Sequence, residues 1–254
     1  MKKENIARIA TIIIIMITLA VIVYFNINPN LKKSPDSNCI TIQENPKSLN
    51  IVFLSYQYKS QDEFLASAKE YINGKAGFAN IEPFKSNMDQ LSFYAVYTTS
   101  MACSTTQGTL ICDDYISKRS ASKCPNDYIF VLGDINSFVD ALVPIRSSAY
   151  LNLGSINTAD NQFVVLHEFA HLFGHLVDEY VDEVSYKSLN INNAPNCDDS
   201  KCTKWSDFNN TQCLKGCSLS TFYRSQDYTI MRNYFKSNSF GVYNEWLLNQ
   251  SLHR

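Results

Sequence analysis

Two histidines four residues apart, His167 and His171, enclose Glu168 in a His-Glu-x-x-His pattern. On a helix, residues four apart project from one face, so both imidazoles can bind the same metal ion. Zinc suits such a pair because it accepts imidazole ligands in a tetrahedral arrangement. Glu168 would lie beside the ion, where its carboxylate can take a proton from a water molecule that zinc has acidified. The pattern predicts a zinc ion (Zn2+) and hydrolysis with Glu168 as general base.

Chance occurrence and ordinary core histidines are the alternatives for this pattern. Three of the chain's four histidines fall within nine residues, at positions 167, 171 and 175, which chance rarely produces. Apolar side chains surround them, so the helix is expected to be buried. Buried imidazoles and a carboxylate need a compensating partner, and a metal ion is the simplest one.

A catalytic zinc takes three protein ligands and keeps one position open. Gly174 can adopt a left-handed conformation, end the helix and return the chain toward the metal. Asp178 is the preferred third ligand, since it has the reach of a returning loop. His175 would coordinate only if the helix continued through Gly174, and Glu179 would point away in an extended backbone. Glu245 is a further candidate, although a solvated helix position explains it as well.

The sequence gives weaker support to two other kinds of metal site. The carboxylates that follow the helix could bind calcium, but they lack the glycine and ligand spacing of an EF-hand loop; they are Asp178, Glu179, Asp182 and Glu183. The last four cysteines could bind a structural zinc, but they lack the close pairs of common zinc knuckles; they are Cys197, Cys202, Cys213 and Cys217.

Strands alternating with helices are expected to position the helix with the histidines. Apolar runs predict strands at residues 50–57, 92–98, 128–133 and 150–153, and helical spacing predicts helices at 61–73, 136–143 and 241–252. This order indicates an α/β fold with a mixed sheet. After residue 180 the chain becomes polar and Cys-rich, which indicates a smaller irregular C-terminal subdomain.

Composition narrows the class of protein. The chain has 254 residues, of which 45% are hydrophobic and 18% charged, a globular balance that argues against disorder. Its net charge of −2 argues against a nucleic-acid partner, which usually requires a basic surface.

The N-terminal segment favours a membrane location. Residues 9–25 carry no charge and follow Lys2, Lys3 and Arg8, as in a single-pass anchor whose N-terminus lies in the cytosol. We expect a cytosolic tip and anchor at 1–27, a linker at 28–47 and a folded domain at 48–254 outside the cytosol. A cleaved signal peptide, which would give a secreted protein, and a buried soluble helix are the alternatives; no small-residue cleavage site follows the apolar run. The even count of eight cysteines favours disulfides, in keeping with an exported domain.

A family resemblance adds to these expectations. The string at 167–174, followed by Asp178-Glu179-Tyr180, resembles the IgA peptidase-like family of metzincin zinc metallopeptidases. Four further segments fit the same pattern, the last resembling a metzincin Met-turn: residues 51–54, 81–84, 152–154 and 228–233.

The resemblance implies zinc on His167, His171 and Asp178, Glu168 as catalytic base, and Met231 as a hydrophobic floor beneath the metal. It implies a metzincin-like zincin fold with an upper subdomain at 48–176 and a lower one at 177–254.

The chain departs from the metzincin pattern at two places. Val177 occupies the position at which most metzincins have their third ligand, and Asp178 comes one residue later. Tyr234 follows Met231 by three residues instead of two, which argues against a role for this tyrosine in stabilising an oxyanion.

The sequence thus predicts an extracellular zinc endopeptidase that acts on a protein or peptide, with residues 149–154 as a strand edge that binds substrate. Oligomeric state is left open. The alternative is a cell-surface binding or envelope protein with a metal-stabilised zincin-like fold and no turnover. Glu168 argues against that alternative, because a structural metal site needs no base.

Overall fold

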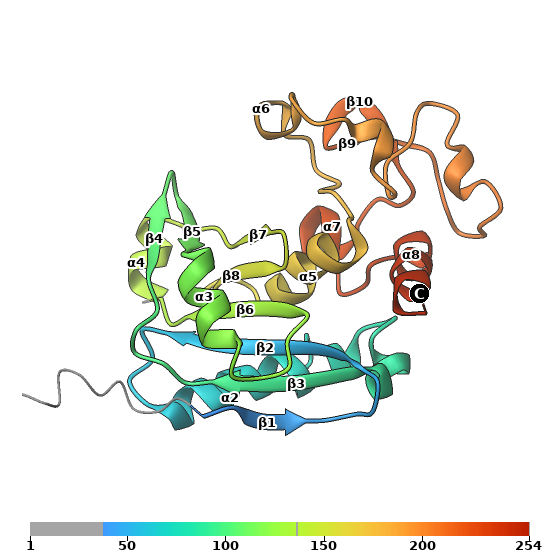
Figure 1. Ribbon diagram of the computed structural model, residues 1–254. Coiled ribbons are helices and arrows are strands. Elements are labelled where there is room, and N and C mark those ends of the chain that lie inside the picture. The colour runs from blue at the N-terminus through green and yellow to red at the C-terminus, as the bar shows by residue number, and fades with distance from the viewer. Residues whose placement is uncertain (1–37, 136, 254) are drawn as a thin grey trace, which may run out of the picture. The chain divides into compact units, whose positions relative to one another are not determined.

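The computed structural model describes residues 38–135 and 137–253, with the side chains of 137–139 left aside. These residues fold around a mixed sheet with helices on both of its faces (Figure 1). Within this described part, no helix has both the length and the apolar character needed to cross a bilayer. The expected anchor at 1–27 lies outside the described residues.

The central sheet has six strands in the order β1-β3-β2-β6-β8-β7. Strands β3, β2, β6 and β8 run parallel, while β1 and β7 are antiparallel edge strands. The bounds are β1 Ile40–Gln43, β2 Leu49–Tyr56, β3 Leu91–Val96, β6 Tyr128–Gly133, β7 Ser148–Tyr150 and β8 Leu153–Asn157. The predicted α/β class with a mixed sheet is therefore confirmed.

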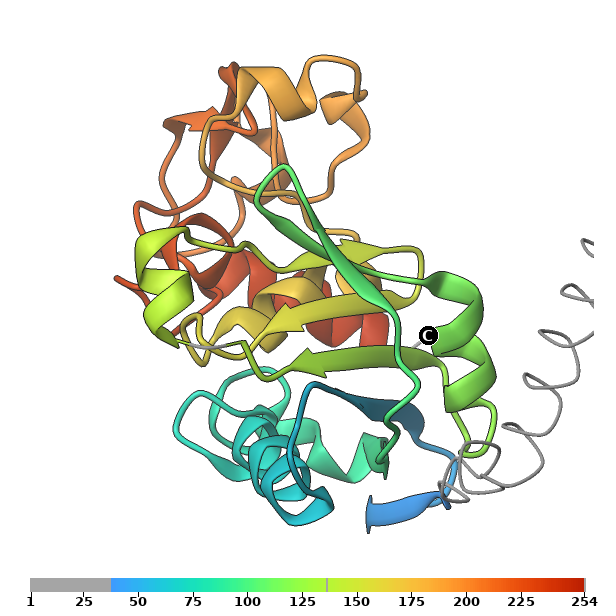
Figure 2. The ribbon, with the colours of Figure 1, turned by 90° about the vertical axis from the view of Figure 1, so that its left-hand side faces the viewer.

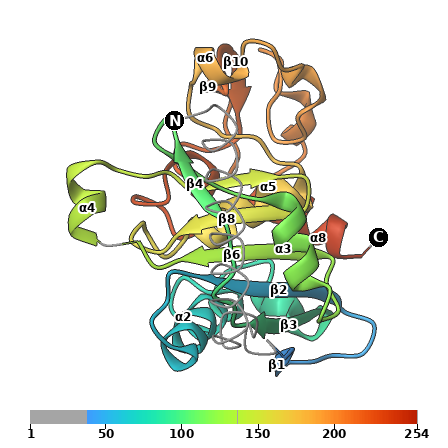
Figure 3. The same cartoon turned by 60° about the vertical axis from the view of Figure 1, so that its left-hand side comes forward.

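Helices lie on both faces of the sheet (Figure 3), and alternate residues of a strand belong to the two different cores on these faces. On β2, Ile51 and Phe53 join the larger core with α2 (Gln61–Asn73) and α5 (Val164–Gly174). Their neighbours Val52 and Leu54 join the smaller core on the other face, beside α3. Each face of the sheet thus has its own packed layer. The helix bounds are α3 Asp114–Ala121, α4 Ser137–Leu142, α6 Glu183–Tyr186, α7 Ile230–Asn233 and α8 Val242–Leu252, with 3-10 turns at Phe78–Asn80, Lys85–Gln90, Ile191–Asn193 and Thr203–Trp205.

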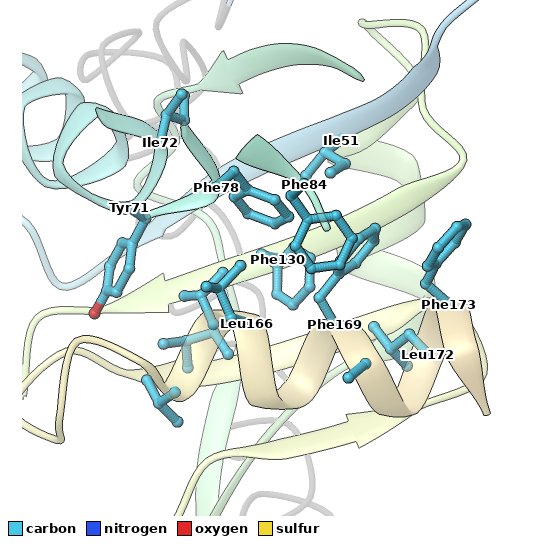
Figure 4. Close-up of a cluster of buried hydrophobic side chains, with 14 of the residues drawn as sticks. Ile51, Tyr71, Ile72, Phe78, Phe84, Phe130, Leu166, Phe169, Leu172 and Phe173 are labelled. Atoms are coloured by element: carbon cyan, nitrogen blue, oxygen red, sulfur yellow. The ribbon is translucent and has the colours of Figure 1, made fainter. Parts of the chain in front are cut away.

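An aromatic cluster fixes α5 against the sheet (Figure 4). The Phe169 ring lies 5.2 Å from Phe78, 5.3 Å from Phe84 and 5.0 Å from Phe173, measured between ring centroids. All four side chains are buried in the larger core. Because Phe169 and Phe173 anchor one face of α5, the histidines that precede them by two residues lie on the other side of the helix.

Two sequence predictions are wrong in detail. The strand expected at 150–153 is interrupted, because Leu151 has a left-handed backbone (φ 54°) and forms the turn between β7 and β8. The linker expected up to residue 47 ends earlier, because β1 pairs with β3. Short edge strands depend on a distant pairing partner, which local sequence does not reveal.

The helices expected at 61–73, 136–143 and 241–252 correspond to α2, α4 and α8.

The residues after 180 form an irregular region on one side of the sheet, around the hairpin of β9 (Leu214–Cys217) and β10 (Leu219–Arg224) (Figure 2). Two disulfides stabilise it, Cys197–Cys217 and Cys202–Cys213. The chain then returns to the larger core through Met231 and Leu248.

Disulfides also connect the N-terminal half. Cys39 pairs with Cys124, and Cys103 pairs with Cys112 across the hairpin of β4 (Cys103–Thr106) and β5 (Thr109–Cys112). All eight cysteines lie in the described part of the chain, and none of them is free. The predicted disulfides are therefore present, and the alternative of a structural zinc on the last four cysteines is excluded.

Candidate metal centre and catalytic cavity

Helix α5 ends where the site requires the chain to turn. Gly174 is its last residue, and a Cβ there would lie 2.5 Å from Cδ2 of Leu248, so a larger residue would force this buried side chain of α8 to move. The left-handed residue is His175 (φ 53°), which corrects the expectation that Gly174 adopts that conformation. The chain then doubles back, and the Leu176 amide donates to the Ala170 carbonyl at 3.2 Å.

The returning segment is held at several points. The Asn196 side chain accepts a hydrogen bond from the Val177 amide (2.9 Å) and donates one to the Val177 carbonyl (2.8 Å). The Ser218 hydroxyl donates to the Asp178 carbonyl (2.7 Å), and the Glu179 amide donates to the Met231 carbonyl (2.9 Å). These bonds fix the backbone on both sides of Asp178, so its carboxylate points at the histidines without a regular element of its own.

Three side-chain donor atoms meet at this point. Nε2 of His167 lies 3.1 Å from Nε2 of His171. Oδ1 of Asp178 lies 3.1 Å from the first nitrogen and 3.3 Å from the second. Neighbouring ligands of a tetrahedral zinc ion are roughly 3.3 to 3.6 Å apart at ordinary bond lengths. Two sides of the triangle are thus about 0.2 Å shorter than this range, so small shifts of the side chains would let the three atoms hold one zinc ion. No other His, Cys, Asp or Glu in the described part of the chain belongs to this group.

Hydrogen bonds on the far side of each ring orient the imidazoles. Nδ1 of His167 lies 3.0 Å from the Ile230 carbonyl oxygen, and Nδ1 of His171 lies 2.6 Å from the Leu176 carbonyl oxygen. A carbonyl only accepts, so each Nδ1 carries a proton, and each ring turns its Nε2 toward the other ring, where the nitrogen can bind a proton or a metal ion. This is the outer-shell arrangement typical of histidines that bind metals.

The two oxygens of the Asp178 carboxylate differ in their hydrogen bonding. Oδ2 accepts a hydrogen bond from the Tyr186 hydroxyl at 2.6 Å. Oδ1 is buried and receives no hydrogen bond in the described part of the chain. A buried acceptor without a donor, facing two imidazole lone pairs, needs a cation for compensation. The donor set therefore fits a divalent metal.

In the metal-free chain a proton serves as that cation. Burial lowers the pKa of His171, but the Asp178 carboxylate outweighs it and raises this pKa to about 9. Burial likewise opposes ionisation of Asp178, yet the charge of His171 and the close approach of both imidazoles hold its pKa well below the usual range. A metal ion would have to displace the His171 proton.

The alternative ligands lie elsewhere. His175 is exposed, and Glu245 accepts a hydrogen bond from Ser239 at 2.7 Å on α8. Glu179 is buried and accepts from Asn196, Asn244 and Thr229, which ties the Asp178 segment to α7 and α8.

The carboxylates weighed for calcium also diverge. Asp182 caps α6 through the Val184 and Ser185 amides, and Glu183 accepts from the Ser220 amide. Asp178 faces the two imidazoles, and Glu179 accepts hydrogen bonds from three side chains. The four carboxylates therefore do not converge on one cation.

A cavity of about 290 Å³ opens beside the three donors. Glu168 and His167 line it together, and burial raises the pKa of Glu168, an effect that both imidazoles only partly offset. The other lining residues come from the approach to β7, from the loop after Asp178 and from α7 and the residues after it; they are Arg146, Ser147, Tyr180, Arg232, Asn233, Tyr234 and Phe235. A carboxylate beside an imidazole that could bind a metal ion, in an open cavity, has the position that a general base requires.

Sequence reasoning undervalued the tyrosines here. Tyr234, set aside because of its spacing from Met231, lies against His167 (5.2 Å between ring centroids) and donates to Asp160 at 3.0 Å. Tyr186 was not singled out, and nothing in its spacing marks it as the partner of Asp178. Met231 is fully buried in the larger core, as expected for a packing residue.

The candidate centre thus comes from three separate parts of the chain. Helix α5 supplies two imidazoles and Glu168, the returning loop supplies Asp178, and the turn at α7 supplies the Ile230 carbonyl that orients one imidazole. Comparison of the chain with protein-family models and with curated proteins finds no match.

Proposed function

We propose that the protein is a zinc-dependent endopeptidase, with zinc held by Nε2 of His167, Nε2 of His171 and Oδ1 of Asp178. The fit of the donor set supports this proposal. Two imidazole nitrogens and one carboxylate oxygen, the oxygen buried without a hydrogen-bond donor, match the ligand types of a catalytic zinc with three protein ligands. The resemblance to metzincin peptidases points to the same ligands.

The observation that carries the catalytic proposal is the place of Glu168 in the cavity wall next to His167. When bound, zinc supplies an acidified water and polarises the substrate carbonyl. Glu168 accepts a proton from the attacking water and then delivers it to the leaving amide nitrogen. The raised pKa of this buried carboxyl brings its proton affinity closer to neutral pH, where such a base is most effective.

We propose that an extended peptide substrate binds along β7, one of the two edge strands of the central sheet. Within the central sheet β7 pairs with β8 alone, and Ser147, just before β7, lines the cavity. The β4–β5 hairpin also hydrogen-bonds the chain at Arg146 and Ser148, which leaves Ala149 and Tyr150 for an added peptide. The predicted substrate-binding edge at 149–154 is therefore limited to its β7 residues, because Gly154 lies in β8, which has a strand on each side. A peptide added to β7 would pass the cavity that contains Glu168.

The proposed setting is outside the cytosol. Four disulfides favour an oxidising compartment. We propose that residues 1–27 anchor the domain to the membrane, on the strength of the uncharged segment at 9–25 and its basic flank.

Replacing Glu168 by alanine tests the function. We expect the zinc-loaded variant to lose about 100- to 10,000-fold in peptide hydrolysis, while zinc content and the circular dichroism spectrum stay unchanged. The matched control is Glu70→Ala, which removes an exposed carboxylate of α2 and should cleave like the wild type. Wild-type turnover in the Glu168 variant would refute the role of base. A wild type that cleaves nothing in a broad peptide library would favour a binding protein instead.

A further inference from the structure

We propose that Arg146 is a receptor for a substrate carboxylate, so that the cavity selects peptides with an acidic group next to the scissile bond. The inference rests on the proposed peptidase function and names its substrate class. Arg146 lines the same cavity as His167 and Glu168 but comes from a different part of the chain, the segment ahead of β7.

The backbone of Arg146 is fixed from both sides. Its amide donates to the Gly108 carbonyl (2.8 Å), and its carbonyl accepts from the Leu110 amide (2.8 Å). Both partners belong to the β4–β5 hairpin, whose strands are closed by the Cys103–Cys112 disulfide. A side chain mounted on such a braced segment keeps its place when a ligand arrives, which lowers the entropic cost of binding.

The guanidinium of Arg146 makes no hydrogen bond or ion pair with any residue in the described part of the chain. The charge of Arg146 makes a small contribution to the lowered pKa of Asp182, a carboxylate that already accepts hydrogen bonds from Ser185 and from the Val184 amide. Arg146 is exposed, so it remains hydrated and available to a ligand.

The second arginine of the cavity is different. Arg232 forms an ion pair with Asp227 at 2.5 Å and lies over the Tyr228 ring, with 5.3 Å from its guanidinium carbon to the ring centroid. Asp227 also pairs with Arg224 at 3.3 Å. Arg232 therefore has its own anion and ring, whereas Arg146 lines the cavity without an ion-pair partner among the described residues.

A carboxylate is the ligand that fits this cation. The planar guanidinium matches a carboxylate with two parallel hydrogen bonds, and this geometry favours carboxylate over the isosteric amide. Glu168 is the one carboxylate in the described cavity lining, and Asp178 is already assigned to the proposed zinc. The ligand carboxylate could come from an Asp or Glu side chain of the substrate or from its C-terminal carboxylate, and these two sources are separable by experiment.

The test compares paired peptides with the zinc-loaded full chain. One arm varies Asp against Asn and Glu against Gln at each position flanking the scissile bond. The other arm compares free and amidated C-termini. We expect the wild type to prefer the acidic member of at least one pair by about 10-fold in kcat/KM, mainly through KM. Arg146→Gln should bring this ratio close to one, Arg146→Glu should reverse it, and Arg146→Lys should restore part of it.

The control is Arg119→Gln, which removes an exposed arginine of α3 and should keep the wild-type ratio. Equal cleavage of acidic and neutral peptides by the wild type would overturn the inference and leave the peptidase function intact. A preference that survives in both Arg146→Gln and Arg146→Glu would overturn it as well. Absence of cleavage of any peptide would instead contradict the proposed function itself.

Discussion

Without its metal, the domain should lose stability as the pH rises from 6 to 8.5. In the metal-free site, the proton on His171 is the cation that faces Asp178. The folded-state pKa of His171, about 9, lies above its ordinary value of 6.5. The folded state therefore keeps this proton in a pH range where the unfolded chain releases it. The stabilisation is complete below pH 6.5 and disappears as the pH rises through about 9.

The size of the effect follows from that difference in pKa. A rise from 6.5 to about 9 corresponds to roughly 3 kcal/mol of unfolding free energy, of which 2 to 3 kcal/mol should be lost by pH 8.5. The side chain of His171 is only 20% exposed, so solvent screens the pair weakly. The low pKa of Asp178 reflects the same ion pair and adds no second contribution. Zinc should reverse the trend, because it binds the deprotonated imidazoles and its affinity rises with pH.

Urea denaturation of chelator-treated protein at several pH values measures this slope. Asp178→Asn is the matched variant, because it removes the charge that raises the His171 pKa and should flatten the dependence. Thermal unfolding of the zinc-loaded protein at pH 6 and 7.5 provides the comparison. A metal-free wild type whose stability stays constant or increases over this range would refute the proposed pairing of His171 with Asp178.

Three further perturbations follow from the contacts around the site. Tyr186→Phe should lower zinc affinity roughly 10- to 100-fold in a competition with a chromophoric chelator, because the ligand carboxylate loses its hydroxyl donor, whereas exposed Tyr115→Phe should not. Glu179→Ala should lower the free energy of unfolding in urea by about 3 kcal/mol or more, because three buried or part-buried donors lose their acceptor. Replacing Cys197 and Cys217 together by serine should lower the free energy of unfolding by about 3 kcal/mol in the same assay, since their disulfide spans a separation of 20 residues. An unchanged denaturation midpoint would contradict this contribution of the disulfide.

Much of the site could be predicted from sequence because its signals are local. The spacing of His167 and His171 places two imidazoles on one helical face whatever surrounds them. Asp178 could be preferred because a chain that turns after a helix returns near its last turns. The long apolar strands and α2 carry strong periodicity, and the structure has them at or near the predicted residues.

The rest depends on contacts between distant residues. Gly174 carries a sequence signal for a left-handed turn, but packing against Leu248 accounts for the glycine, and His175 makes the turn. Tyr186 and Arg146 are single residues in segments without a pattern. Only the three-dimensional structure reveals that one holds the Asp178 carboxylate and the other reaches the cavity.

X-ray absorption at the zinc edge on the zinc-loaded protein tests the central claim most directly. The account predicts one zinc per chain with two imidazole nitrogens near 2.0–2.1 Å and oxygen ligands near 2.0–2.2 Å, and no sulfur. The imidazole signal should fall by half in His171→Ala, if that variant still binds the metal. A spectrum with sulfur ligands, with a single imidazole in the wild type, or with full wild-type coordination in His171→Ala would contradict the account.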